Sequence, residues 1–454
     1  MEIHLNTLNS QLHTDNPKLL DALVELYSFK VPGAEYSPQY RGHFWDGKKK
    51  FFSRKGHFKT GLLERVLADL KKVDAKVKLV DNRDPNNSTK PYKFKEITYY
   101  DYQQRAIKEA LQKKRLIVKA PTGSGKTLIM AGLVKALQGR KMVLLFNAKQ
   151  LLTQTYDFLT ETCKLNNIGI CFGEGFILGD IMLCTVQSIE KILDTHLNSE
   201  VLMVDECHEF CNGKTTVAAI QSFPNANYRY GFTATPPSQK ISLFNLEGGL
   251  GPIYSVATTE QLVEEGKLTK PIIQIIERSH DSISRDDTLT YTEVYDQFIV
   301  NNEERNNKIK EIANDIRKKN ERARILILTK SLDHGRTLEN LLGGECQFLE
   351  GANSIGERYN SISRFRRCRD SSILIGTKIL QTGVNIEEIT HFINARGMKS
   401  EIATLQALGR ALRKHETKEE VYIYDFLDQE KYLREHSLER INHYTREGHE
   451  VIKI

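Results

Sequence analysis

The sequence lacks paired cysteines, long apolar runs and all but one tryptophan. Its seven cysteines are scattered through 454 residues without a CxxC pair, so we expect reduced, mostly buried thiols and neither a metal cluster nor a disulfide framework. No stretch approaches the roughly 18 uninterrupted apolar residues of a membrane span, and the opening MEIHLNTLNS has no basic or apolar signal segment. We therefore expect a cytoplasmic protein with no membrane partner.

The composition favours a globular chain of two to four domains. Apolar residues make up 40% and charged residues 27%, which is enough for proper cores. The net charge is +7, but residues 41–80 alone hold 12 Lys or Arg against 4 Asp or Glu. The positive charge is thus concentrated near the N-terminus, where it favours a polyanionic partner.

Turn-rich and apolar segments divide the chain into three parts. Residues 81–91 are polar and nearly free of apolar side chains, which is typical of a linker, so a small α+β domain is expected over 1–82. Beyond the linker, apolar runs of strand length alternate with helical stretches, which predicts parallel sheets covered on both sides. We expect two such α/β domains in tandem, over 92–270 and 271–454.

The segment APTGSGKT, residues 120–127, follows a predicted strand and opens a predicted helix, as a phosphate-binding loop requires. Its glycines let the backbone N–H groups converge on phosphate oxygens, and the start of the helix adds positive charge. Ala120 replaces the Gly that begins the strict motif. The residues expected to bind the nucleotide here are Thr122, Gly123, Ser124, Gly125, Lys126 and Thr127.

The segment VLMVDECH places two carboxylates directly after an apolar strand. Next to a bound γ-phosphate, Asp205 would hold Mg²⁺ together with the Thr127 hydroxyl, and Glu206 would orient and deprotonate the attacking water. ATP and Mg²⁺ are therefore the expected cofactors, and Lys126, Asp205 and Glu206 are candidate catalytic residues.

Seven motifs in order resemble those of superfamily 2 helicases and translocases. YQQRAI, APTGSGKT, DECH and TATP lie in the first α/β domain, and ILILT, ILQTGVNI and QALGRALR lie in the second. The resemblance implies two RecA-like domains. It assigns Gln103 to adenine recognition, Gly383 to the nucleotide site, and His208 and Thr233 to coupling with the nucleic acid. As the less favoured alternative, each of the two coupling residues could simply be a buried polar group satisfied by backbone. The family's motif V carries Asp where this chain has Asn385, which weakens that match.

The last motif has a helical spacing with a chemical meaning. Gln406, Arg410 and Arg413 differ by four and three positions, so their side chains share one face of a helix. If that face looks at the nucleotide, the two arginines act as fingers on the γ-phosphate and complete the catalytic set.

The basic N-terminal segment carries a narrower resemblance. YSPQYRGHFWDGKKKFF, followed by GHFKTGLLERV, is similar to the small N-terminal domain of bacteriophage UvsW-type recombination helicases, which remodel forks and junctions. This implies a phage enzyme in the host cytoplasm that acts on branched DNA. We expect the ring of Trp45 and most phenylalanines to face inward and the charges outward, although base stacking by these rings stays open. The candidate DNA-binding residues are Arg41, Lys48, Lys49, Lys50, Arg54, Lys55 and Lys59.

Three other functions remain open. The chain could be a translocase on double-stranded DNA that does not separate strands, or an RNA helicase, which is less favoured. It could also be a DNA-binding or annealing module with a vestigial ATPase, although every expected catalytic residue is present. We expect a monomer.

Overall fold

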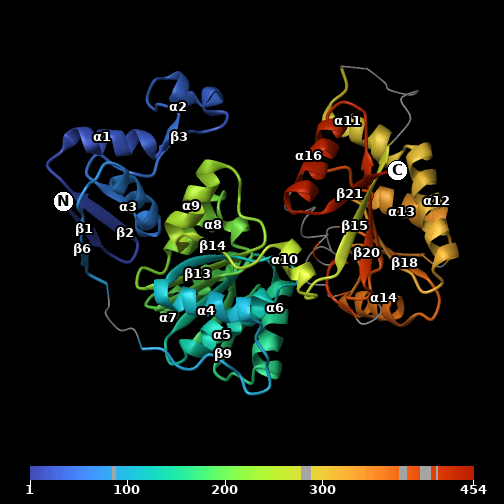
Figure 1. Ribbon diagram of the computed structural model, residues 1–454, viewed down its shortest axis with the longest axis horizontal. Helices are drawn as coiled ribbons and strands as arrows, with labels where there is room; N and C mark the ends of the chain where they lie inside the picture. Colours follow the sequence, from blue (N-terminus) through green and yellow to red (C-terminus); the bar gives the residue numbers. More distant parts are fainter. Residues whose placement is uncertain are drawn as a thin grey trace. The chain divides into compact units, whose positions relative to one another are not determined.

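The computed structural model describes residues 1–83, 88–277, 288–344, 346–377, 386–398, 409, 411–415 and 418–454. The chain forms two compact units, Met1–Ala120 with Gly125–Val256, and Pro121–Ser124 with Ala257–Ile454. Within the described residues, the first unit holds a four-stranded sheet, a two-stranded hairpin and an eight-stranded sheet, and the second holds a seven-stranded sheet (Figure 1). No helix in these ranges is long and apolar enough to cross a membrane.

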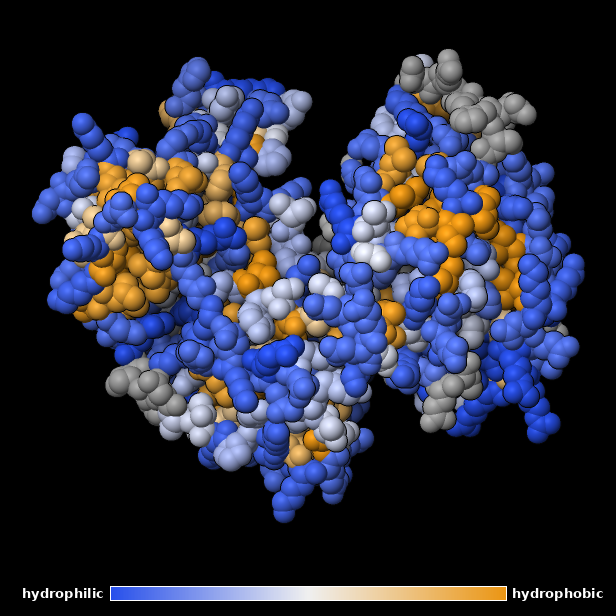
Figure 2. Space-filling model, in the orientation of Figure 1, coloured by the Kyte–Doolittle hydropathy of each residue, from blue (hydrophilic) through white to orange (hydrophobic). Residues whose placement is uncertain are grey.

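The N-terminal domain is built on the four-stranded sheet, in the order β5-β2-β1-β6. Helix α1 is capped by Asn16, whose Oδ1 accepts a hydrogen bond from Leu19 N at 3.1 Å. Apolar side chains gather over β1 and β6 in Figure 2, where Leu79 is exposed. The elements are β1 (Glu2–Leu5), β2 (Asn9–His13), α1 (Pro17–Leu26), β3 (Ser28–Lys30), α2 (Pro38–Arg41), β4 (Lys48–Lys50), β5 (His57–Lys59), η2 (Thr60–Leu62), α3 (Leu63–Lys72) and β6 (Lys78–Asp81).

The first α/β domain has the strand order β10-β9-β11-β8-β12-β13-β7-β14. All neighbouring strands are parallel except the β9–β10 pair, and the central strands are buried over their full length, which explains their continuous apolar sequences. The strands are β7 (Arg115–Lys119), β8 (Met142–Phe146), β9 (Ile168–Phe172), β10 (Gly175–Ile177), β11 (Ile181–Thr185), β12 (Val201–Val204), β13 (Tyr228–Thr233) and β14 (Ile253–Ser255). The helices are α4 (Asp101–Lys113), α5 (Lys126–Ala136), α6 (Lys149–Asp157), α7 (Leu193–His196), α8 (Lys214–Gln221) and α9 (Lys240–Leu250).

The second α/β domain has the order β17-β18-β16-β19-β20-β15-β21, and its strand pairs are all parallel in the described residues. The predicted parallel-sheet architecture is therefore confirmed in both domains. The strands are β15 (Lys270–Glu277), β16 (Arg324–Leu328), β17 (Cys346–Leu349), β18 (Ser372–Gly376), β19 (His391–Asn394), β20 (Glu420–Leu427) and β21 (Glu450–Lys453). The helices are α10 (Thr259–Glu264), α11 (Tyr291–Tyr295), α12 (Glu303–Lys319), α13 (Leu332–Leu342), α14 (Ile355–Arg367) and α16 (Leu433–Arg446).

Helix α9 of the first α/β domain packs directly on the N-terminal domain. The Phe244 ring lies 4.7 Å from the Phe29 ring, centroid to centroid, in an edge-on contact. Arg65 Nη2 donates to Glu247 Oε1 at 2.8 Å, and the Glu247 carboxylate is buried. A Cβ at Gly61 would lie 2.0 Å from the carbonyl oxygen of Glu247, so the close approach of η2 to α9 requires glycine there. The two domains thus share a core.

Candidate nucleotide and nucleic-acid sites

The glycine-rich loop joins the end of β7 to the start of α5. Gly123 and Gly125 have φ of +87° and +81°, a backbone conformation that a side chain would strain. Gly125 caps α5, whose first N–H groups therefore face the loop. Lys126 Nζ donates to Ala120 O at 3.3 Å, and Thr127, the next residue, is exposed. The loop has the backbone shape that cradles a phosphate.

The predicted glutamine lies beside this loop. Gln103 is buried in the first turn of α4, where its Oε1 accepts a hydrogen bond from Tyr100 N at 3.0 Å. A Cβ at Gly125 would lie 2.5 Å from Gln103 Nε2, so the amide sits against the loop backbone. The packing of α4 on α5 thus brings two motifs more than twenty residues apart into one place.

The two carboxylates follow β12, as predicted. Asp205 N donates to Leu145 O at 3.0 Å, which fixes the end of the strand. Burial, and then the neighbouring Glu206 charge, raise the pKa of Asp205 to about 7, whereas the Lys126 charge acts in the opposite direction. Glu206 has φ of +42°, and its buried Oε2 accepts no hydrogen bond in the described part of the chain. The carboxylate oxygens of this pair are hard donors of the kind that Mg²⁺ prefers, and His208 Nδ1 lies 3.4 Å from Glu206 Oε2.

A hydrogen bond joins the two residues predicted to couple the sites. His208 Nδ1 and Thr233 Oγ1 lie 2.8 Å apart, and both side chains are buried. Thr233 ends β13, and its carbonyl accepts from Ala120 N at 3.0 Å, at the entrance to the glycine-rich loop. The three motifs after β7, β12 and β13 are therefore in direct contact.

The arginine motif is described only in part. Gly383, Gln406 and Arg410 lie outside the described residues. Arg413 is held in the second unit, where Thr269 Oγ1 donates to its carbonyl oxygen at 3.2 Å. Burial lowers the pKa of the Arg413 guanidinium, and the Glu387 charge partly offsets this.

The seven basic candidates for DNA binding fall into different environments. Lys48, Lys49, Lys50, Arg54 and Lys59 line one cavity, whereas Arg41 and Lys55 are exposed and do not line it. Arg41 Nε donates to Glu35 O at 3.1 Å. The structure therefore brings together five of the seven side chains.

The aromatic rings near these basic side chains differ in how far they are buried. Phe52 is 1% exposed and stacks on Phe58, and Trp45 is half-buried with its Nε1 donating to Lys48 O at 2.9 Å. Phe44 departs from the expected inward orientation, because it is 89% exposed. It lies in the turn between α2 and β4, where neither sheet can cover it.

The sequence reasoning missed the residues that the first α/β domain contributes to this region. Gln221 of α8 and Phe244 and Asn245 of α9 line the same cavity as the basic side chains. The available signal was in α9 itself, KISLFNLEGGL, which carries apolar residues on more than one face. Such a helix needs a second packing partner besides its own sheet.

Two protein families match this chain. The family described as "Type III restriction enzyme, res subunit" matches residues 96–238, and "Helicase conserved C-terminal domain" matches residues 304–415. The matches fall in the first and second α/β domains, on either side of residue 270.

Individual proteins match over most of the chain. The "ATP-dependent DNA helicase uvsW" of Enterobacteria phage T4 is 24% identical over 471 residues, covering 94% of this chain and 93% of that protein. The crystal structure of T4 UvsW covers 100% of this chain and 99% of its own, with 21% identity and a TM-score of 0.49. The DNA-bound Type ISP restriction-modification enzyme LlaBIII has a TM-score of 0.61 at 16% identity, over 86% of this chain and 34% of that one, and so shares the fold.

Proposed function

Because the chain is a superfamily 2 helicase, we propose that it uses ATP to unwind and branch-migrate forked or junction DNA. We further propose that it serves recombination, repair or replication of a phage in the host cytoplasm. The proposal rests on one observation. The glycine-rich loop lies beside Gln103 and beside the Asp205–Glu206 pair, at the ends of parallel strands. Crevices at such strand ends bind ligands in α/β proteins.

The residues of the first α/β domain would divide the work of hydrolysis. Gln103 would recognise adenine, and Lys126 would bind the β- and γ-phosphates with the loop N–H groups. Thr127 and Asp205 are the oxygen donors for Mg²⁺, which when bound neutralises phosphate charge. Glu206 would orient the attacking water and accept its proton, a role suited to a buried carboxylate oxygen that accepts no other hydrogen bond in the described residues.

The second α/β domain would sense the nucleotide from its own side. We assign Gln406, Arg410 and Arg413 to the γ-phosphate and Gly383 to the nucleotide edge of the site. An arginine that stabilises the transferred phosphoryl group is worth roughly 10³ to 10⁵ in rate. Closure on ATP and release after hydrolysis would then drive movement along DNA.

The N-terminal domain would supply the contacts to branched DNA. Its cluster of lysines and arginines suits phosphate contacts, which carry no sequence code and fit an enzyme that recognises branch shape. The relative that matches nearly the whole chain, including this domain, is named a DNA helicase. These assignments use the predicted boundaries 1–82, 92–270 and 271–454.

The test compares substrates under one ATPase and strand-displacement assay. We expect forks and four-way junctions to stimulate ATP hydrolysis and to be unwound, and Lys126→Ala to abolish both. Movement on plain duplex without displacement at a fork would show a translocase instead. Stimulation of ATP hydrolysis by RNA but not by DNA would show an RNA helicase. Equal ATP hydrolysis by wild type and Lys126→Ala would show that the protein is a DNA-binding or annealing module with a vestigial ATPase.

A further inference from the structure

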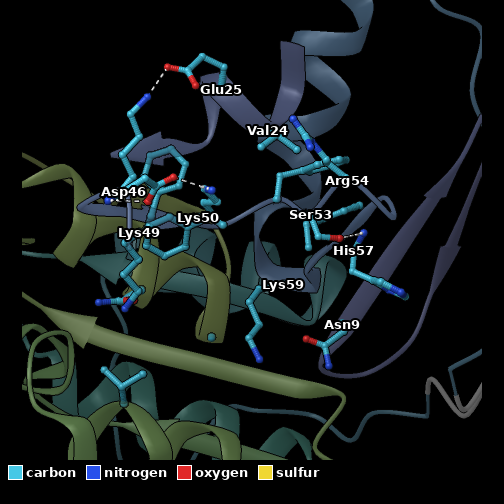
Figure 3. Close-up of a pocket in the computed structure, with 18 of the residues that line it drawn as sticks. Asn9, Val24, Glu25, Asp46, Lys49, Lys50, Ser53, Arg54, His57 and Lys59 are labelled. Atoms are coloured by element: carbon cyan, nitrogen blue, oxygen red, sulfur yellow. Dashed lines mark hydrogen bonds and ion pairs between the residues drawn. The ribbon is translucent and has the colours of Figure 1, made fainter. Parts of the chain in front are cut away.

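A cleft lies between the N-terminal domain and the first α/β domain. It has a volume of about 920 Å³. Figure 3 shows Lys49, Lys50, Arg54 and Lys59 from the N-terminal side around it, and α8 and α9 close its other side. The cleft is separate from the glycine-rich loop and from both carboxylates of the nucleotide site.

Three of the five cationic side chains in this cleft form ion pairs with nearby carboxylates. Lys48 Nζ lies 2.6 Å from Glu25 Oε1, Lys50 Nζ lies 2.7 Å from Asp46 Oδ2, and Arg54 Nε lies 3.1 Å from Asp21 Oδ1. Such pairs stabilise the domain little, but they reduce the charge that these cations offer to a ligand.

Lys49 and Lys59 have no carboxylate partner in the described part of the chain. Lys59 Nζ donates to Gln221 Oε1 of α8 at 3.2 Å, and Lys49 Nζ lies 5.4 Å from the centre of the Phe51 ring. Burial lowers the pKa of both amines. Lys59 is half-buried, and a cation partly removed from water without an acidic partner is unfavourable, so a bound anion would lower that cost; Lys49 is exposed and would add an unpaired charge.

The two amines are held on a shared frame. The Phe51 ring, next to Lys49, lies 5.3 Å from the Phe244 ring of α9, and a Cβ at Gly248 of α9 would lie 3.1 Å from Lys59 Cβ. Lys59 therefore sits against α9, and Lys49 lies over a ring, Phe51, that packs on the same helix. The hydrogen bond to Gln221 restrains the Lys59 amine before any ligand arrives, which lowers the entropic cost of binding there.

We propose that this cleft binds the phosphodiester backbone of DNA, with Lys49 and Lys59 as the phosphate contacts and Gln221 as the residue that positions Lys59. This rests on the proposed DNA helicase function and narrows its seven basic candidates to two. The cleft is open, and the nearby Phe29 and Phe51 rings are packed against Phe244. The cleft therefore offers positive charge to phosphates and no free ring on which a base could stack. The N-terminal domain and the first α/β domain hold the strand jointly.

The experiment measures DNA affinity as a function of salt for the full chain. A fluorescent fork, a single strand and an RNA strand of equal length are titrated with wild type and Lys49→Ala/Lys59→Ala between 50 and 300 mM KCl, values chosen to span physiological salt. We expect the fork to bind about tenfold more weakly, and the slope of log K against log salt to fall by about 1.4 to 1.8, as two lost phosphate contacts require.

The matched control is Lys71→Ala/Lys76→Ala, which removes two exposed lysines of the same domain that do not line the cleft. It should change the slope by less than half as much. Lys49→Arg/Lys59→Arg keeps the charges and should restore the wild-type slope, which separates charge from folding. Equal losses in the cleft and control variants, or a loss confined to RNA, would overturn the inference. The proposed function fails separately, if no DNA stimulates hydrolysis by wild type.

Discussion

His208 Nδ1 lies 2.8 Å from Thr233 Oγ1, so the segments after β12 and β13 are joined by one buried hydrogen bond. The same Oγ1 accepts from Thr235 N at 3.1 Å. We predict that Thr233→Val, which removes the hydrogen bonds to His208 and to Thr235 N, keeps ATP binding but lowers DNA-stimulated hydrolysis and unwinding at least about tenfold. One such bond of about 1 to 1.5 kcal/mol already corresponds to a factor of about ten. Hydrolysis is measured with and without a fork.

Tyr230→Phe is the matched control for this prediction. Tyr230 lies on the same strand, and its buried hydroxyl donates to Ala110 O at 3.1 Å, away from His208. Its loss should lower the free energy of unfolding by a similar amount and leave the stimulation by DNA unchanged. If the fork stimulates ATP hydrolysis equally in Thr233→Val and Tyr230→Phe, the His208–Thr233 hydrogen bond has no part in coupling.

Gly125 gives a sharper prediction for the nucleotide. Alanine there would put a Cβ 2.5 Å from Gln103 Nε2, at φ of +81°, where side chains are strained. We predict that Gly125→Ala weakens the binding of a fluorescent ATP analogue at least tenfold, because both the loop and the glutamine must shift. Gly173→Ala, at φ of +50° with nothing within 4 Å, is the control and should bind as wild type does. If Gly125→Ala binds the ATP analogue as tightly as wild type does, Gln103 is not part of the nucleotide site.

Local rules account for what the sequence predicts well. The turn at Gly123 and Gly125 and the strand that ends just before Asp205 each depend on a few neighbouring residues and recur wherever that chemistry is needed. The alternation of apolar runs with helical stretches then indicated two parallel sheets.

The sequence did not predict which basic side chains form ion pairs, because this depends largely on tertiary contacts. Lys48, Lys49 and Lys50 are chemically identical neighbours, yet Glu25 neutralises the first and Asp46 the third. Asp46 lies four residues before Lys50, but Glu25 reaches Lys48 only through the fold. Which lysine lacks an acidic partner therefore depends in part on tertiary contacts that no local pattern encodes. The exposure of Phe44, in a stretch of otherwise covered rings, has the same origin.

Trp45 is the single tryptophan, so its fluorescence reports unfolding of the N-terminal domain alone. We predict that Phe244→Ala, in the other domain, lowers that unfolding free energy by about 3 kcal/mol, because the Phe29, Phe51 and Phe244 rings form one packed cluster. The measurement is urea unfolding followed by Trp45 emission. Phe176→Ala is the control, since Phe176 is 47% exposed. An unshifted Trp45 transition in Phe244→Ala would show that the domains fold independently.

His391 in the second α/β domain makes stability depend on pH. Its ring is buried and stacks on the Tyr422 ring, with centroids 5.4 Å apart, and burial lowers its pKa from 6.5 to about 4. Between these values the unfolded chain binds more protons than the folded one, so the free energy of unfolding falls as pH falls from about 6.5 toward 4.

The contribution of His391 to this fall is about 2.5 kcal/mol at pH 4.5, relative to pH 8. His391→Phe keeps a flat ring beside Tyr422 but cannot take up a proton. Urea unfolding of wild type and variant at pH 8 and pH 4.5, followed by far-UV circular dichroism, should therefore show a smaller acid loss in the variant by about that amount. His334, whose pKa burial also lowers to about 3, titrates in both proteins and cancels in the comparison. Equal losses in the two proteins would mean that His391 titrates alike in the folded and the unfolded chain, so that its burial does not lower its pKa.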